Sequence, residues 1–163
     1  MVVDETLHPI VVVTGSRSFS GNSAARAWLR ERLTALAPKL VVTGDAIGPD
    51  FWAAEWAAEF GVPCLVYGLD GAAFLIFFEN GEKRTVVQRW TEEKVPARGT
   101  FESRRWPLKR NDAMVAFAAS RLPESPVLVV GLPNPDATTQ GTGYTLSAAS
   151  RKGIPTCIFS RES

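Results

Sequence analysis

The feature that most constrains this chain is a short apolar run near its start that ends in a glycine. Ile10–Val13 is apolar and mostly β-branched, and Thr14-Gly15-Ser16-Arg17 follows it directly. A helical pattern begins at about Asn22, a residue type that favours the N-cap. A buried strand that ends in a glycine turn and opens onto a helix is typical of the phosphate-binding corner of a doubly wound α/β domain. Backbone amides at such a helix start favour an anion, and Arg17 adds a cation beside them.

Length and composition predict one globular domain spanning residues 1–163. Eighteen Lys and Arg oppose 17 Asp and Glu, and the resulting net charge of +1 gives no global field to attract nucleic acid or a membrane. Cys64 and Cys157 each lie in an apolar run, which favours a reducing cytoplasm over a disulfide framework. Because His8 is the single histidine, we expect no Cys/His metal site. We also expect no bound cofactor. The first five residues show no signal-peptide pattern.

The first 70 residues follow a β-α-β-α-β order. Helical spacing from Asn22 leads to a second strand, Leu40–Val42, which ends at the loop Gly44–Asp50. A second helical pattern follows, and Gly61 is its predicted stop before a third strand, Cys64–Tyr67. We expect each parallel pair of strands to be joined by a right-handed crossover.

The middle of the chain departs from this order. Two β-rich runs flank Asn80-Gly81, which predicts an inserted β-hairpin over about residues 73–90 that packs on the domain but does not continue its sheet. Residues 91–106 are predicted to be a loop, and helical spacing resumes only after Pro107. Two more strands, with a helix between them, complete the chain. The prediction is a Rossmann-like, doubly wound, mainly parallel five-stranded sheet with helices on both faces and one hairpin.

Three small-residue loops follow strands of this predicted sheet. They are Gly15-Ser16-Arg17, Gly44–Asp50 and Gly141-Thr142-Gly143. In open parallel sheets ligands bind beyond the carboxyl ends of the strands, so the three loops should share one edge and offer amides to phosphate or ribose oxygens. Taken singly, each glycine is explained equally well by a tight turn. None of the loops is the dinucleotide fingerprint or the P-loop, which disfavours an ordinary NAD dehydrogenase or NTPase.

Four ordered motifs give a more specific comparison. Thr14–Phe19, Gly44–Asp50, Arg110–Met114 and the stretch from Gly141-Thr142 to Pro155 resemble motifs of the SLOG superfamily, the Rossmann-like group named for the Smf/DprA and LOG proteins. The YspA/cpYpsA-related branch is the most similar. The resemblance covers the chain except for an insertion at about residues 71–106.

The resemblance implies binding or sensing of a nucleotide or a nucleotide-derived molecule, such as one related to NAD or ADP-ribose. It implies that Gly15, Ser16 and Arg17 contact phosphate and that Asp50 orients the second loop or a ribose hydroxyl. Asp50 is also a candidate N-cap of the helix that follows it. By the same resemblance the remaining ligand-facing residues would be Gly44, Asp45, Arg110, Asn111, Gly141, Thr142 and Gly143.

Two departures from the family bear on catalysis. Members that cleave the base from a nucleoside monophosphate carry a glutamate shortly after the Gly-Thr motif, whereas Tyr144 and Thr145 follow Gly143 here. In the second loop, Asp45 replaces a glycine of the family pattern, and it either repels phosphate or supplies the missing carboxylate. A nucleotide N-glycosidase or phosphoribohydrolase that uses Asp45 or Asp50 is therefore the alternative function.

Two further alternatives concern the insertion. Arginines and lysines alternate with Phe101 and Trp106 over residues 98–110, a composition that suits single-stranded nucleic acid as in the DNA-processing relatives. We favour the simpler interpretation that both rings are buried against the hairpin. The apolar stripe of the hairpin suggests a lid or a homodimer surface, although packing within one chain explains it equally well.

Overall fold

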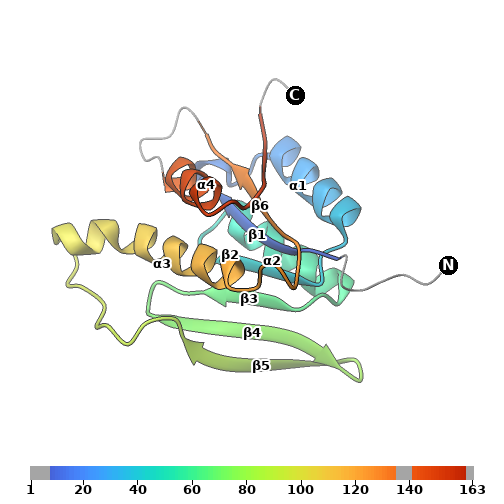
Figure 1. Ribbon diagram of the computed structural model, residues 1–163, viewed down its shortest axis with the longest axis horizontal. Coiled ribbons are helices and arrows are strands. Elements are labelled where there is room, and N and C mark those ends of the chain that lie inside the picture. The colour runs from blue at the N-terminus through green and yellow to red at the C-terminus, as the bar shows by residue number, and fades with distance from the viewer. Residues whose placement is uncertain (1–7, 135–140, 161–163) are drawn as a thin grey trace.

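The computed structural model describes residues 8–134 and 141–160, which form a layered α/β domain (Figure 1). The elements that position the candidate site follow in chain order and keep the labels of the figure. They are β1 (Ile10–Gly15), the short 3-10 helix η2 (Arg17–Phe19), α1 (Ser23–Leu36), β2 (Leu40–Gly44), α2 (Pro49–Phe60), β3 (Cys64–Tyr67), β4 (Ala72–Glu79), β5 (Glu82–Arg89), α3 (Phe101–Ala119), β6 (Val127–Leu132), α4 (Gly141–Arg151) and β7 (Thr156–Ile158).

The sheet has seven strands in the order β5-β4-β3-β2-β1-β6-β7. The five strands from β3 to β7 in that order are parallel, and β4 and β5 are antiparallel. The Rossmann-like α/β prediction is therefore confirmed. The chain order reverses between β1 and β6, and open α/β sheets bind ligands at such a switch point.

The hairpin β4–β5 extends this sheet, so the prediction that it would not continue the main sheet is wrong. Phe74 of β4 pairs with Val66 of β3. The turn between these strands is tight, because Gly68 N–H donates to Ala72 O and Gly71 takes a φ of +91°. An antiparallel neighbour needs only such a turn, whereas a parallel one needs a crossover helix. The hairpin can therefore join the sheet without a crossover helix.

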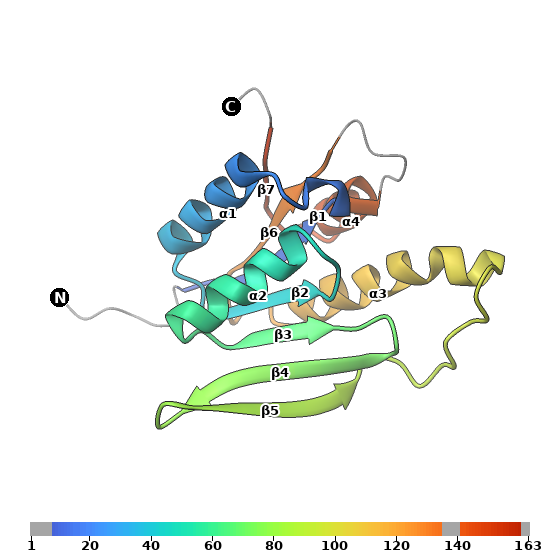
Figure 2. The same cartoon turned by 180° about the vertical axis from the view of Figure 1, so that it is seen from behind.

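Helices cover both faces of the sheet, as Figures 1 and 2 show from opposite sides. α3 and α4 lie together on one face, and α1 and α2 lie together on the other. β1 alternates between the two resulting cores: Val12 belongs to the core under α3 and α4, and Val11 and Val13 belong to the other. A strand buried on both faces is apolar at every position, which explains the uninterrupted run near the start of the sequence.

Several predicted turn signals are confirmed. Asn22 caps α1 by accepting a hydrogen bond from Ala25 N–H at 3.0 Å. Gly61 ends α2 with a φ of +67°. Asn80 and Gly81 turn the hairpin with φ values of +53° and +81°, the left-handed pair that a two-residue hairpin loop requires. These signals are local, so they can be read without knowledge of the tertiary structure.

α3 begins at Phe101, and the predicted loop over residues 91–106 is wrong in its last part. Thr100 caps the helix by accepting a hydrogen bond from Ser103 N–H at 3.1 Å. Pro107 lies inside the helix although it provides no N–H for the backbone ladder. Tertiary packing compensates, because the indole of Trp106 donates to Leu69 O at 2.7 Å. None of the described helices is long and apolar enough to cross a membrane.

The expected burial of two rings against the hairpin holds for one of them. Trp106 is buried, and its ring lies 5.3 Å from that of Trp90, the residue that follows β5. Phe101 is 60% exposed, so the expectation is wrong for this residue. Phe101 is the first residue of α3, and Figure 1 shows that the start of this helix extends past the end of the hairpin, which explains the difference.

Candidate functional site

The loop after β1 is held by its own hydroxyl groups. Ser16 caps η2, and its Oγ accepts from Ser18 N–H at 3.3 Å and lies 2.6 Å from Ser18 Oγ. Phe19 is buried and anchors the end of η2. Arg17 is exposed and makes no ion pair with any residue that the structure describes. The exposed Arg17 cation therefore lies on a loop that is held by these hydrogen bonds and by the buried Phe19.

The loop after β2 packs directly against the loop after β1. A Cβ on Gly15 would lie 2.4 Å from the Pro49 side chain, and a Cβ on Gly48 would lie 3.3 Å from Ser16 O. Both positions therefore require glycine for close approach, and Gly48 also has a φ of +85°. The first two predicted loops are thus brought together at the carboxyl end of the sheet.

Asp50 lies beneath the second loop and does not cap α2, because the N-cap position belongs to Gly48. The Asp50 carboxylate is 5% exposed and accepts a hydrogen bond from Ala46 N–H at 3.2 Å. It therefore orders the loop from within, and the predicted N-cap role is wrong. Burial raises the pKa of Asp50 to about 6, although the nearby Arg110 guanidinium acts in the opposite direction.

Arg110 connects the second loop to α3. Its Nη1 donates to Asp45 Oδ1 at 2.8 Å and to the carbonyl oxygen of Tyr67 at 3.1 Å, and its Nε donates to Asn111 Oδ1 at 2.8 Å. The side chain is 6% exposed. A Cβ on Gly44 would lie 2.7 Å from Arg110 Cζ and 2.5 Å from Asp50 Oδ2. Glycine at position 44 is what allows the guanidinium and the two carboxylates to gather.

Asn111 carries the network on to the first turn of α4. Its Nδ2 donates to Thr145 Oγ1 at 3.0 Å, and Thr145 Oγ1 donates to Gly141 O at 3.0 Å. Gly141, Thr142 and Gly143 were predicted to be a loop, and this prediction is wrong because α4 begins at Gly141. Thr142 is buried in this turn, whereas a Cβ on Gly143 would meet no atom within 4 Å. The first N–H groups of a helix have no partner within it, so this turn can supply donors to an anion. The preceding residues 135–140 lie outside the described part of the chain.

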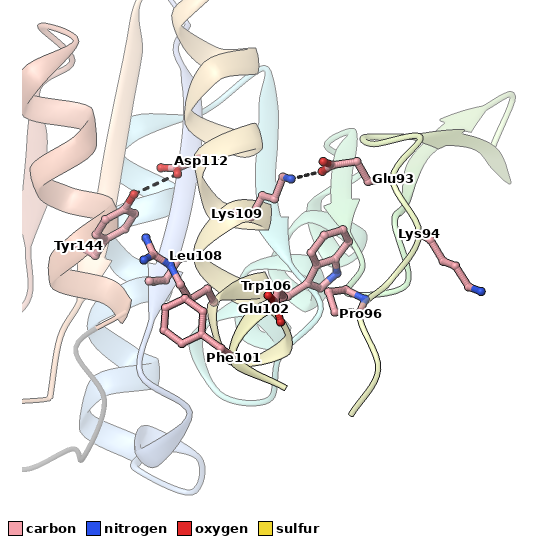
Figure 3. A pocket seen from close by; sticks show the side chains of 11 residues that line it. Glu93, Lys94, Pro96, Phe101, Glu102, Trp106, Leu108, Lys109, Asp112 and Tyr144 are labelled. Atoms are coloured by element: carbon pink, nitrogen blue, oxygen red, sulfur yellow. Dashed lines mark hydrogen bonds and ion pairs between the residues drawn. The ribbon is translucent and has the colours of Figure 1, made fainter. Parts of the chain in front are cut away.

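A groove of about 520 Å³ runs along the outward face of α3 beside this network (Figure 3). Leu108, Asp112 and Tyr144 form its inner end, and Phe101 and Trp106 lie further along it. Tyr144 Oη donates to Asp112 Oδ2 at 3.0 Å. This hydrogen bond favours the neutral phenol and raises the pKa of Tyr144.

Sequence reasoning missed this groove. Phe101, Arg105, Leu108 and Asp112 recur at helical spacing and so share one face of α3. That pattern is visible in the sequence only if the helix is continued through Pro107. The pairing of Asp112 with Tyr144 has no sequence signal, because it depends on how α3 packs against α4. Among the described residues no group of three or more His, Cys, Asp or Glu side chains is placed to hold a metal ion.

The chain was compared with known proteins by sequence and by structure. No family model matches it, and no curated protein sequence matches it. Among solved structures it is similar to the DNA processing protein A (DprA) of Streptococcus pneumoniae, with a TM-score of 0.61 at 17% identity. The match covers 95% of this chain and 51% of that one, so this chain spans about half the length of DprA. The chain therefore has a Rossmann-like fold similar to that of part of DprA.

Proposed function

We propose that the carboxyl edge of the sheet binds a nucleotide or a nucleotide-derived small molecule. The observation that carries the proposal is the continuous set of contacts from Ser16, through Pro49 and Arg110, to Gly141. These contacts fix the three small-residue loops relative to one another at a switch point of the sheet. A preformed set of amides and cations at such a point suits a phosphorylated ligand. The motif resemblance to the YspA-related branch supports the same ligand class.

The proposal gives two arginines different roles. Arg17 is exposed at the edge of the sheet and is free to meet phosphate. Arg110 is enclosed, and its Nε and Nη1 donors are engaged by protein acceptors. We therefore assign phosphate contact to Arg17, Ser16 and the first turn of α4, and we assign the positioning of the loops to Arg110.

Ligand screening by thermal shift tests the proposal, because a ligand that binds the folded state raises its melting temperature. The screen uses nucleoside monophosphates, ADP-ribose and NAD. We expect at least one of them to stabilise the protein, and we expect Arg17→Ala to reduce that shift. Lys152→Ala is the matched control, because it also removes an exposed cation but lies after α4, at the opposite end of the sheet. Absence of a shift with every probe would contradict the proposal.

Hydrolysis of the nucleotide at its N-glycosidic bond is the second candidate function. The observation that favours it is the Asp45 side chain, which is 43% exposed at the edge of the sheet. Arg110 donates to its Oδ1 at 2.8 Å and Leu69 N–H donates to its Oδ2 at 3.3 Å, which leaves lone pairs of both oxygens open to solvent. Such a carboxylate could accept the proton of an attacking water as the bond between C1′ and the base breaks. Asp50 is too enclosed for this role. Release of free base by wild type, and its loss in Asp45→Asn, would establish the activity; no release by wild type would exclude it for the nucleotides tested.

Single-stranded nucleic acid is disfavoured as the ligand of the α3 groove. Three carboxylates, Glu93, Glu102 and Asp112, line it together with three cations, Lys94, Arg105 and Lys109. Lys109 is moreover paired with Glu93. A balanced surface lacks the excess positive charge that drives phosphate-backbone binding. Steep salt-dependent affinity for an oligonucleotide would overturn this inference.

A further inference from the structure

A second groove lies between the first turns of α1 and α2, on the face of the sheet that these two helices cover (Figure 2). Its volume is about 500 Å³, and Gly48, the N-cap of α2, is one of the residues that line it. A Cβ on Gly48 would lie 3.3 Å from Ser16 O and 3.7 Å from Arg17 Cα. This α1–α2 groove therefore adjoins the loop at which we place the phosphate. A ligand held by Arg17 has the groove within reach of its next chemical group.

Two large apolar side chains of this groove are exposed. Ile47 is 61% exposed and Phe51 is 59% exposed, and both line the groove. Exposed apolar groups that gather at one place mark a binding surface, whereas single ones need no explanation. The charged groups of the groove balance each other, because Arg26 forms an ion pair with Glu55. An apolar wall with a few polar groups, in a space of this size, is typical of a small-molecule site.

The ring of Phe51 has no aromatic or cationic partner within residues 8–134 and 141–160. The other exposed phenylalanine rings do have one. The Phe60 ring lies 5.0 Å from that of Trp56, and the Arg105 guanidinium lies 5.6 Å from the centroid of Phe101. An exposed ring without such a partner can stack on a nucleobase, because every base has a flat π face.

The rings of the α3 groove are less open to a base. Trp106 is buried, and its ring lies 5.3 Å from that of Trp90 and 5.5 Å from Lys109 Nζ. The Tyr144 ring is half-buried, and its hydroxyl group donates to Asp112. The α1–α2 groove is therefore the better place for a base whose phosphate is bound at the loop after β1.

We propose that the α1–α2 groove binds the base of the nucleotide, which stacks on Phe51 beside the apolar side chain of Ile47. The inference rests on the proposed function, since it requires the phosphate at the loop after β1. Stacking uses the face of the base, so the groove adds affinity for a nucleotide over its sugar phosphate without reading the base edge.

Isothermal titration with AMP and with ribose 5-phosphate tests the proposal, because the two ligands share the phosphate and differ by the base. We expect wild type to bind AMP about tenfold more tightly than ribose 5-phosphate, as stacking of one base on an aromatic ring allows. Phe51→Ala should bring the two affinities within about threefold. The affinity for ribose 5-phosphate should not change, since this ligand has no base.

Two further variants isolate the ring of Phe51. Phe60→Ala is the matched control, because it removes a ring that is 52% exposed from the last residue of the same helix. It lies nine residues later and about 14 Å away along the helix axis, and it should keep the wild-type preference. Phe51→Trp keeps an aromatic face and should also keep the preference. Circular dichroism of each variant shows that it is folded.

The outcomes separate this proposal from the proposed function. Equal affinity of wild type for AMP and ribose 5-phosphate would overturn base recognition and leave phosphate binding intact. A preference that survives in Phe51→Ala would overturn the role of Phe51, and its loss in Tyr144→Leu instead would place the base in the α3 groove. Absence of binding by both ligands would overturn this proposal together with the proposed function.

Discussion

The two halves of α3 differ in almost every respect although they form one helix. The inner half, Arg110–Ala119, lies against the sheet and buries Arg110, Asn111, Met114, Val115 and Ala118. The outer half, Phe101–Lys109, extends past the parallel strands, and Trp106 is its one buried residue (Figure 1). The inner half fixes the loops at the edge of the sheet, and the outer half lines the groove. One helix thus provides both the rigid base of the candidate site and its open wall.

The largest effect is expected where the inner half meets the second loop. Gly44→Val would place its Cβ 2.5 Å from Asp50 Oδ2 and 2.7 Å from Arg110 Cζ. Overpacking among buried charged groups should cost about 3 kcal/mol or more of the free energy of unfolding. Urea denaturation measures it. Gly143→Ala is the control, because it meets no atom within 4 Å and should change stability by less than about 1 kcal/mol. Equal stability of Gly44→Val and wild type would contradict the described contacts.

A smaller effect is expected from the titration of Asp50. The pKa of the Asp50 carboxyl is about 6 in the folded protein, whereas an aspartate in an unfolded chain has its ordinary pKa of 3.8. The folded state therefore binds this proton more tightly than the unfolded state does. The resulting stabilisation is fully present below about pH 3.8 and is lost as the pH rises through about 6. As the pH rises through this interval, the free energy of unfolding of Asp50→Asn should therefore increase relative to that of wild type by roughly 2–3 kcal/mol. Above about pH 6 the difference between the two proteins should stay constant. A difference between the two proteins that is independent of pH would refute this assignment.

The anchor of the outer half should have a weaker and more local effect. Trp106→Phe leaves the Leu69 carbonyl without its 2.7 Å hydrogen bond and should cost about 1 kcal/mol. Hydrogen exchange should accelerate at the amides of residues 101–109 and remain slow at residues 110–119. Phe101→Ala is the control, because this ring is 60% exposed. Faster exchange across both halves would show that α3 opens as one unit.

The smallest effect is expected on the open face of the outer half. Arg105 is exposed, and its guanidinium lies 5.6 Å from the Phe101 ring centroid. Arg105→Gln should change the unfolding free energy by less than about 0.5 kcal/mol, as surface substitutions usually do. A larger loss in urea denaturation would show that the outer half contributes more to stability than its burial indicates.

The same contrast explains how much the sequence could predict. The strand–glycine–helix unit at Gly15, the Asn80-Gly81 turn and the burial of Met114 follow from local pattern and spacing. The outer half of α3 does not, because Pro107 is a helix breaker by propensity, and the hydrogen bond from Trp106 to Leu69 that anchors this half is a tertiary contact. A hairpin as an added edge of the sheet likewise depends on strand pairing that no local signal specifies.

In the candidate site, too, the features set by local pattern were predicted and those set by tertiary packing were not. The three small-residue segments were predicted from their glycines. The structure packs the first two loops against each other, and it places the third segment in the first turn of α4 and not in a loop. The enclosure of Arg110 between Asp45 and Asn111 was not predicted, because motif spacing does not show which way a side chain points. The contact between Asp112 and Tyr144 was not predicted, since it joins residues 32 positions apart on two helices.

The most direct test of nucleotide binding at this edge is an NMR titration of the ¹⁵N-labelled protein with AMP. We predict chemical-shift changes that saturate with AMP and are largest at the amides of residues 15–17, 44–46 and 141–143. Arg17→Ala should weaken the binding curve, and Lys152→Ala should leave it unchanged. An unperturbed spectrum at millimolar AMP, or shifts confined to the hairpin β4–β5, would contradict the account.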